Sequence, residues 1–144
     1  MIQRIQSIYL FLAAFISGGL VFFVSFFSYN EMEASNVISL LENDRFLIKS
    51  IGIGFFLSSF ISFLSIFLFK KRQNQFVLGR LNILINFYLL GVLIYESLKV
   101  SGGASVSEKG IGIYLPIIIV VLLVMANKSI KMDENLVKSV DRLR

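Results

Sequence analysis

The stretch Lys70-Lys71-Arg72-Gln73-Asn74-Gln75 decides the fold. A charge-free apolar run, Ser50 to Phe69, ends directly before it, and another apolar segment begins at Phe76. A run of about 20 apolar residues is long enough to cross a bilayer as a helix. We therefore predict that this basic turn joins two membrane-spanning hairpins.

The composition favours a membrane protein over a soluble domain. Of 144 residues, 56% are hydrophobic and only 16% are charged, whereas soluble domains have about 45–50% apolar and about 25% charged residues. The sequence has no cysteine and no histidine, which removes thiolate chemistry, the commonest general base and the commonest metal ligand. It also has no nucleophile–base pair, metal cluster or phosphate-binding loop. We accordingly expect no enzyme and no cofactor.

The apolar segments predict an all-α polytopic membrane protein with four transmembrane helices in two hairpins, formed as one domain over 1–144. The expected spans are about 8–28, 50–69, 77–96 and 111–127, followed by an amphipathic tail over 128–144 that we expect to lie along the membrane surface. No small-x-small site follows the first span, so we interpret it as an uncleaved helix. Val37 to Leu41 is expected to form a short surface helix. Pro116 should kink the fourth span or mark its start.

Basic residues predict the orientation. With four spans, both termini and the central turn lie on one side of the membrane. Ten basic residues belong to that side, namely Arg4, Lys70, Lys71, Arg72, Arg80, Lys128, Lys131, Lys138, Arg142 and Arg144. Four belong to the other side: Arg45, Lys49, Lys99 and Lys109. Basic residues favour the cytoplasmic side, so the termini are expected in the cytoplasm, with anionic lipid headgroups rather than nucleic acid as the partner of the charges.

Small and polar residues mark the faces on which membrane helices pack. They are Ala14, Gly18 and Ser25 in the first span, Gly54, Ser58, Ser62 and Ser65 in the second, and Gly79, Asn82 and Asn86 in the third. We expect these stripes to face inward in a four-helix bundle, with phenylalanines facing lipid. The alternative is that one stripe faces a second copy of the chain and forms a homodimer.

Three polar residues within or beside the third span are candidates for function. Asn82 and Asn86 could line a pathway or bind a headgroup, or they could be interhelical hydrogen-bonding residues only. Glu96 is the one carboxylate near a span. It could be an intramembrane acid of a proton-coupled transporter, although its place near the outer helix end favours a solvated acid about one turn from Lys99.

Arg80 lies near the start of the third span. It could bind a lipid phosphate, pair with an acid of the tail such as Asp133, Glu134 or Asp141, or serve only as a positively charged anchor.

The two ends of the chain carry a family resemblance. The start Met-Ile-Gln-Arg-Ile-Gln over 1–6 and the end Asp-Glu-Asn-Leu-Val-Lys-Ser-Val-Asp-Arg-Leu-Arg over 133–144 resemble an uncharacterised family of small bacterial four-span membrane proteins, a domain of unknown function. Arg80-Leu81-Asn82 and Tyr114-Leu115-Pro116 fit the same pattern. The resemblance implies that certain residues match the family, and we regard those that are charged as candidates for a specific cytoplasmic surface. The matching residues are Gln3, Arg4, Arg80, Asn82, Pro116, Asp133, Glu134, Asp141 and Arg142.

These observations favour a non-enzymatic inner-membrane protein that acts as an accessory or scaffold subunit with a basic cytoplasmic face. A protein partner or a homo-oligomer would fit this role. The first alternative is a small transporter or pore, perhaps as a dimer, that uses Asn82, Asn86 and Glu96. A second alternative is a holin-like lesion former, suggested by the size and the charged tail.

Overall fold

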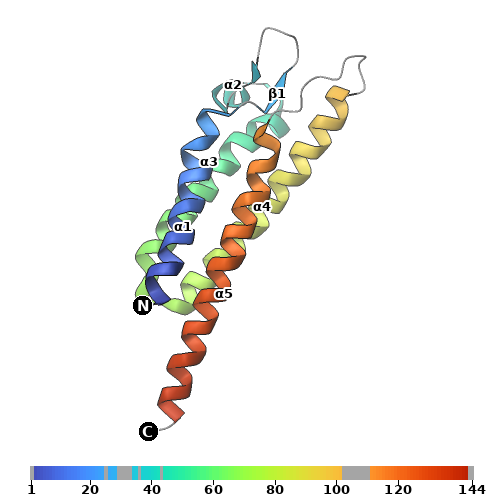
Figure 1. The fold of residues 1–144 in the computed structure, drawn as a ribbon. Coiled ribbons are helices and arrows are strands. Elements are labelled where there is room, and N and C mark those ends of the chain that lie inside the picture. The colour runs from blue at the N-terminus through green and yellow to red at the C-terminus, as the bar shows by residue number, and fades with distance from the viewer. Residues whose placement is uncertain are drawn as a thin grey trace.

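A computed structural model shows four long helices arranged as a bundle (Figure 1). It describes residues 2–24, 26–28, 34–35, 37–42, 44–101 and 111–142. The long helices are α1 (Ile2–Gly18), α3 (Phe46–Phe67), α4 (Arg72–Ser101) and α5 (Leu115–Arg142). Together with the short turns that adjoin them, they give four helical segments long and apolar enough to cross a membrane. The prediction of an all-α fold with four candidate spans is confirmed.

The short elements lie at the ends of the long helices. They are η1 (Leu20–Phe22), β1 (Phe27–Ser28), β2 (Ala34–Ser35), α2 (Val37–Glu42), η2 (Leu68–Lys70) and η3 (Ile111–Tyr114). Strands β1 and β2 pair antiparallel, with Phe27 opposite Ser35. The short helix expected after Val37 is present as α2, and its Val37 and Leu40 side chains are buried in the core rather than exposed on a surface.

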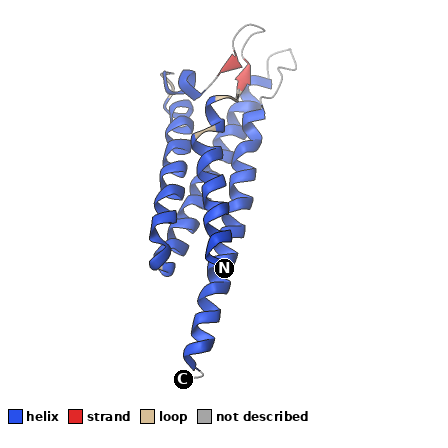
Figure 2. Ribbon diagram, turned by 60° about the vertical axis from the view of Figure 1, so that its left-hand side comes forward, coloured by secondary structure: helices blue, strands red, loops and turns tan. Residues whose placement is uncertain are grey.

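The four helices form a ring in which each packs against two neighbours. Helix α1 contacts α3 and α5, and α4 contacts the same two helices. Consecutive long helices run in opposite directions, so the start of α1, the α3–α4 turn and the C-terminal part of α5 share one end of the bundle (Figures 1 and 2). We call this the termini end.

The small-residue stripes face inward, as expected. Ser58, Ser62 and Ser65 of α3 are buried. On α1, a Cβ atom added at Gly18 would collide with the Ser59 hydroxyl, and the same hydroxyl donates a hydrogen bond to the Ala14 carbonyl oxygen at 3.1 Å. Close backbone approach at small residues is how membrane helices associate. Ser25, the third member of the stripe expected in the first span, lies outside the described residues.

The central turn is shorter than expected from the sequence. Helix α3 is followed by η2, and α4 already begins at Arg72, so the chain reverses around Lys71 alone. Gln75, which the sequence analysis places in the turn, is a helix residue that is only 1% exposed. The reason is that Arg72 and Gln75 continue the 3-and-4 spacing of the inward face of α4, so packing extends the helix to Arg72.

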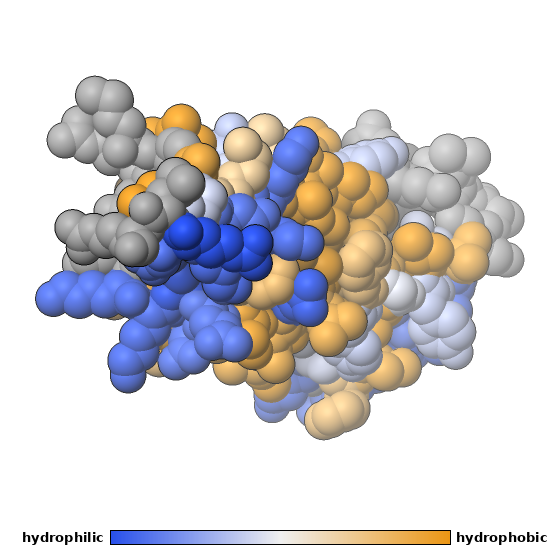
Figure 3. Space-filling view, turned by 90° about the horizontal axis from the view of Figure 1, so that it is seen from below, coloured by the Kyte–Doolittle hydropathy of each residue, from blue (hydrophilic) through white to orange (hydrophobic). Residues whose placement is uncertain are grey.

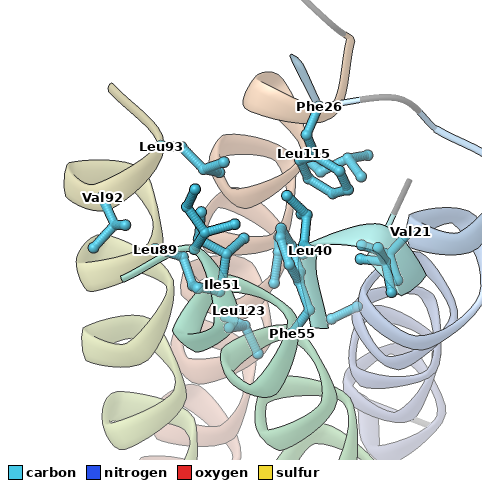
Figure 4. Packing of buried hydrophobic residues seen from close by; sticks show 14 of the residues in the cluster. Val21, Phe26, Leu40, Ile51, Phe55, Leu89, Val92, Leu93, Leu115 and Leu123 are labelled. Atoms are coloured by element: carbon cyan, nitrogen blue, oxygen red, sulfur yellow. The ribbon is translucent and has the colours of Figure 1, made fainter. Parts of the chain in front are cut away.

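The apolar core contains many residues in the half of the bundle away from the termini end. Leu89 and Leu93 of α4, Ile51 and Phe55 of α3, and Leu115 of α5 contribute to it (Figure 4). The Phe26 and Phe55 rings lie 5.5 Å apart between centroids. Toward the termini end, buried polar side chains of α4 lie alongside apolar residues such as Leu10, Ala126 and Ile130.

Helix α5 begins where the sequence suggested and ends much later. Pro116 is its second residue, so the proline marks the helix start. The helix continues through the expected end of the span to Arg142 and extends past the other helices along its own axis (Figure 1). The tail continues α5 as one helix because residues 128–142 contain no proline or glycine that would break it, and its expected placement along the membrane surface stays a prediction.

Candidate functional site: a buried polar seam

One inward face of α4 carries a row of polar and small residues that we call the polar seam. It consists of Arg72, Gln75, Gly79, Asn82 and Asn86. The spacings of 3, 4, 3 and 4 residues keep all five on one face of a helix. Because a helix rises about 1.5 Å per residue, the seam runs about 21 Å from the termini end toward the apolar core. All but the half-buried Arg72 are buried.

The inner end of the seam is tied to α3 by hydrogen bonds. The Asn82 amide nitrogen donates to the Ser62 hydroxyl at 2.7 Å and to the Ser58 carbonyl oxygen at 3.0 Å. The Asn86 amide nitrogen donates to the Ser58 hydroxyl at 2.8 Å and to the carbonyl oxygen of Asn82 at 2.9 Å. Such bonds contribute roughly 0.6–2 kcal/mol each between membrane helices. Asn82 and Asn86 thus stabilise the α3–α4 hairpin, whatever else they do.

The middle of the seam meets α5 at Gly79. A Cβ atom added there would collide with the Asn127 amide, whose carbon and nitrogen would lie 2.8 and 2.9 Å away. Only a glycine leaves room for Asn127, a buried residue that is 7% exposed. Ser65 lies one turn beyond Ser62 on α3, so it is placed near the level of Gly79 by the antiparallel α3–α4 pairing.

The outer end of the seam is closed by α1 and α5. Gln6 of α1 donates its amide N–H to the Asp133 carboxylate of α5 at 2.8 Å. Arg72 donates to the carbonyl oxygen of Asp133 at 3.3 Å. Asp133 is only 8% exposed, so its carboxylate lies within the packed end of the bundle. A carboxylate that far from solvent needs hydrogen-bond donors, and Gln6 supplies one.

Three buried oxygens of the seam region lack a hydrogen-bond partner within the described chain. They are the amide oxygens of Gln75, Asn86 and Asn127. All three are acceptors, because an amide oxygen has lone pairs and no proton. An unpaired acceptor in a packed interior costs about 1–3 kcal/mol. These oxygens could therefore accept a hydrogen bond from a bound group or contact a bound cation.

Glu96 is buried, with 1% of the residue exposed, so the expectation of a solvated acid is wrong. One carboxylate oxygen lies 3.7 Å from the Lys99 ammonium, and the other has no partner among the described residues. The side chain faces inward because residue 96 continues the 3-and-4 spacing of the seam face beyond Leu89 and Leu93. Those two leucines are fully buried and separate Glu96 from Asn86.

The other charged candidates lie mostly on exposed surface, near the termini end. Arg80 is exposed, with its guanidinium carbon 4.3 Å from the centre of the Phe76 ring. Glu134 is half-buried and pairs with Lys138 at 2.7 Å, whereas Asp141 and Arg142 are exposed near the end of α5. The alternative in which Arg80 pairs with Asp133, Glu134 or Asp141 is not seen, because the ion pairs of the described residues are Glu96–Lys99 and Glu134–Lys138. Arg4 lies in the first turn of α1, and its side chain is outside the described part.

The sequence analysis missed Gln6, Gln75 and Asn127 as members of the site. Gln75 could have been found by extending the 3-and-4 spacing of Gly79, Asn82 and Asn86 toward the N-terminus. Gln6 and Asn127 lie on other helices, and no spacing along the chain indicates that they face this seam. Among the described residues, no three His, Cys, Asp or Glu side chains come together in a way that could hold a metal ion.

Comparison with known proteins gives a family and no activity. No curated protein and no solved structure matches the chain. A family model described as "Domain of unknown function (DUF4293)" matches residues 2–143, almost the whole chain. The resemblance expected from the two ends of the sequence is confirmed: the chain belongs to the family described as a domain of unknown function, DUF4293.

Proposed function

We propose that this protein is a non-enzymatic accessory or scaffold subunit of the inner membrane, with both termini in the cytoplasm. In this role it holds a partner protein at the membrane through the C-terminal part of α5. The observation that carries the proposal is the shape of that helix, which leaves the bundle and exposes apolar side chains.

The projecting part of α5 begins after Asp133, the last buried residue of the helix. Residues 135–142 are all exposed, and the helix extends about 13–14 Å beyond Asp133. Leu136 and Val140 are 52% and 61% exposed, and they lie one turn apart on the helix. We propose that this helix, which continues along the bundle axis, carries the two side chains away from the bilayer. A partner protein is therefore the occupant that we propose.

Charge indicates which kind of partner would fit. The exposed basic residues of the same helix are Lys128, Lys131, Lys138 and Arg142, and Lys71 is exposed in the α3–α4 turn at the termini end. Hydrophilic residues gather at the left of the view in Figure 3, and apolar residues cover its middle. Complementary charge guides association and determines which partners bind. We propose a partner surface with apolar residues at its centre and acidic residues around them.

A small transporter or pore that uses Asn82, Asn86 and Glu96 stays the second proposal. The polar seam favours it, but Leu89 and Leu93 interrupt the row between Asn86 and Glu96. If Glu96 couples proton transport, Glu96→Gln should abolish proton-linked flux in proteoliposomes, and unchanged flux would exclude it. The holin-like alternative would be supported by toxicity on overexpression, and no described feature favours it.

Affinity purification of the tagged full-length protein in mild detergent tests the leading proposal. We compare Leu136→Glu/Val140→Glu with a matched control, Asn135→Glu/Ser139→Glu, which adds the same charge to the neighbouring exposed face. A specific partner should co-purify with the wild type and the control and be lost from the first variant. If no partner co-purifies with the wild type, or if the same amount of partner co-purifies with both variants, the proposal is refuted.

A further inference from the structure

We propose that the outer half of the polar seam, between Gln75 and Asn127, binds a small monovalent cation. This inference is independent of the proposed docking role, because it concerns the interior of the bundle rather than the projecting helix.

The two amides that define the site have unpartnered oxygens. The oxygens of Gln75 and Asn127 have no hydrogen-bond partner in the described chain, and these residues are 1% and 7% exposed. Both amide oxygens are hydrogen-bond acceptors. An anion would add further acceptors to the site and would leave them unsatisfied. A cation would satisfy both.

Gln75 and Asn127 belong to facing helices and lie at neighbouring levels of the α4–α5 contact, so we take their amide oxygens as ligands of one site. The Asn127 oxygen lies against Gly79, and Gln75 is one turn from Gly79 on the same face of α4, which is about 6 Å along the helix axis. The Ser65 hydroxyl donates to its own helix at the Ile61 carbonyl, which leaves its oxygen able to accept at a level near Gly79. Sodium and potassium ions are commonly held by carbonyl-type oxygens of this kind.

The charges around the site also favour a cation. The Asp133 carboxylate lies at the outer end and accepts a hydrogen bond from the neutral Gln6 amide. It takes part in neither of the two ion pairs of the described chain, Glu96–Lys99 and Glu134–Lys138. Arg72, the seam's one cationic side chain, lies at the outermost position, is half-buried and donates to the Asp133 carbonyl oxygen, so the row from Gln75 to Asn86 itself carries no positive charge.

Thermal unfolding of the purified full-length protein in detergent tests the site. We compare NaCl, KCl and N-methylglucamine chloride at equal ionic strength. Binding stabilises the folded state, so at a hundredfold excess over Kd the bound ion should raise Tm by roughly 5–10 °C. A rise in one alkali salt identifies the ion. Equal Tm values in all three salts would overturn the proposal and leave water as the group that meets these oxygens.

Two variants of similar volume locate the effect. Gln75→Met and Asn127→Leu each remove an amide whose oxygen is unpartnered, so in N-methylglucamine chloride they should fold with an unchanged or higher Tm. Both should lose the ion-dependent rise, with at least tenfold weaker binding. Gln73→Met is the matched control, since Gln73 is exposed in the same turn of α4, and it should keep the rise. A rise retained in both seam variants would place the ion elsewhere and refute the site.

A direct binding measurement guards against variants that do not fold. Radioactive sodium, or rubidium as a potassium substitute, is titrated onto the immobilised wild-type protein. We expect saturable binding of one ion per chain, displaced by the unlabelled ion. Absence of saturable binding by either ion would overturn the proposal without reference to any variant.

Discussion

Two glycines of α4, one in the polar seam and one outside it, allow the tightness of the α4–α5 contact to be tested by the same glycine-to-alanine substitution. At Gly79, an added Cβ atom meets the Asn127 amide, whereas at Gly91 none of the atoms of the described chain lies within 4 Å. Replacing glycine with alanine inside a helix favours folding by up to about 1 kcal/mol. We expect this gain for Gly91→Ala, because nothing opposes it.

At Gly79 the same gain is opposed by overpacking, which typically costs about 1–3 kcal/mol in a close-packed interior. The net change for Gly79→Ala should therefore be between about 0 and 2 kcal/mol of destabilisation. The free energies of unfolding of the two variants should differ by about 1–3 kcal/mol. Asn127→Ala removes the amide that the added Cβ atom would meet. In that background Gly79→Ala should therefore raise the free energy of unfolding, with a coupling energy between the two sites of about 1–3 kcal/mol.

The assay is reversible unfolding in mixed micelles of a mild detergent and dodecyl sulfate, followed by tyrosine fluorescence, since the chain has no tryptophan. All four proteins are compared: wild type, the two single variants at Gly79 and Asn127, and the double variant, with Gly91→Ala as the control. If Gly79→Ala and Gly91→Ala stabilise the protein equally, or if no coupling with Asn127 is found, the close approach of α4 and α5 at Gly79 is wrong.

Four further substitutions test the polar contacts. Asn82→Leu removes two bonds to α3 and should destabilise the protein by about 1–3 kcal/mol in the same assay; a stabilised variant would contradict the bonding. Gln6→Ala and Asp133→Ala should each cost about 1–3 kcal/mol and should not be additive, whereas additive losses would show that the two side chains do not interact. Glu96→Gln should leave stability unchanged or raise it by up to about 1 kcal/mol, because it removes a buried charge with one distant partner; a loss above 1 kcal/mol would reveal a partner that the structure does not show.

The helical framework could be predicted from the sequence because it depends on long apolar runs. A segment surrounded by lipid needs apolar side chains. Its backbone groups must also be hydrogen-bonded within the segment, which makes it a helix. The inward positions of Ser58, Ser62, Asn82 and Asn86 could be predicted as well, since they repeat with the period of a helix on otherwise apolar segments.

The rest of the site could not be predicted, because it depends on which helices become neighbours. Gln6 and Asp133 are 127 residues apart in sequence and meet only when α1 packs against α5. Glu96 was expected to be solvated because counting residues gives depth along a helix and not the direction of a side chain. Gln75 was assigned to the turn because polar residues beside three basic ones are typical of a loop, and only packing against the other helices extends α4 to Arg72.

The most direct test of the buried seam uses the absence of native cysteines. Single cysteine pairs are introduced in the full-length protein, and disulfide formation in native membranes is measured by gel mobility after mild oxidation. The pair Ser62→Cys/Asn82→Cys replaces two side chains that contact each other at 2.7 Å. The control pair Ser62→Cys/Leu81→Cys uses a neighbouring residue that is exposed on α4. We predict rapid cross-linking within one chain for the first pair and little for the control. Equal cross-linking of both pairs, or preferential cross-linking of the control, would contradict a seam that faces α3 in the interior of the bundle.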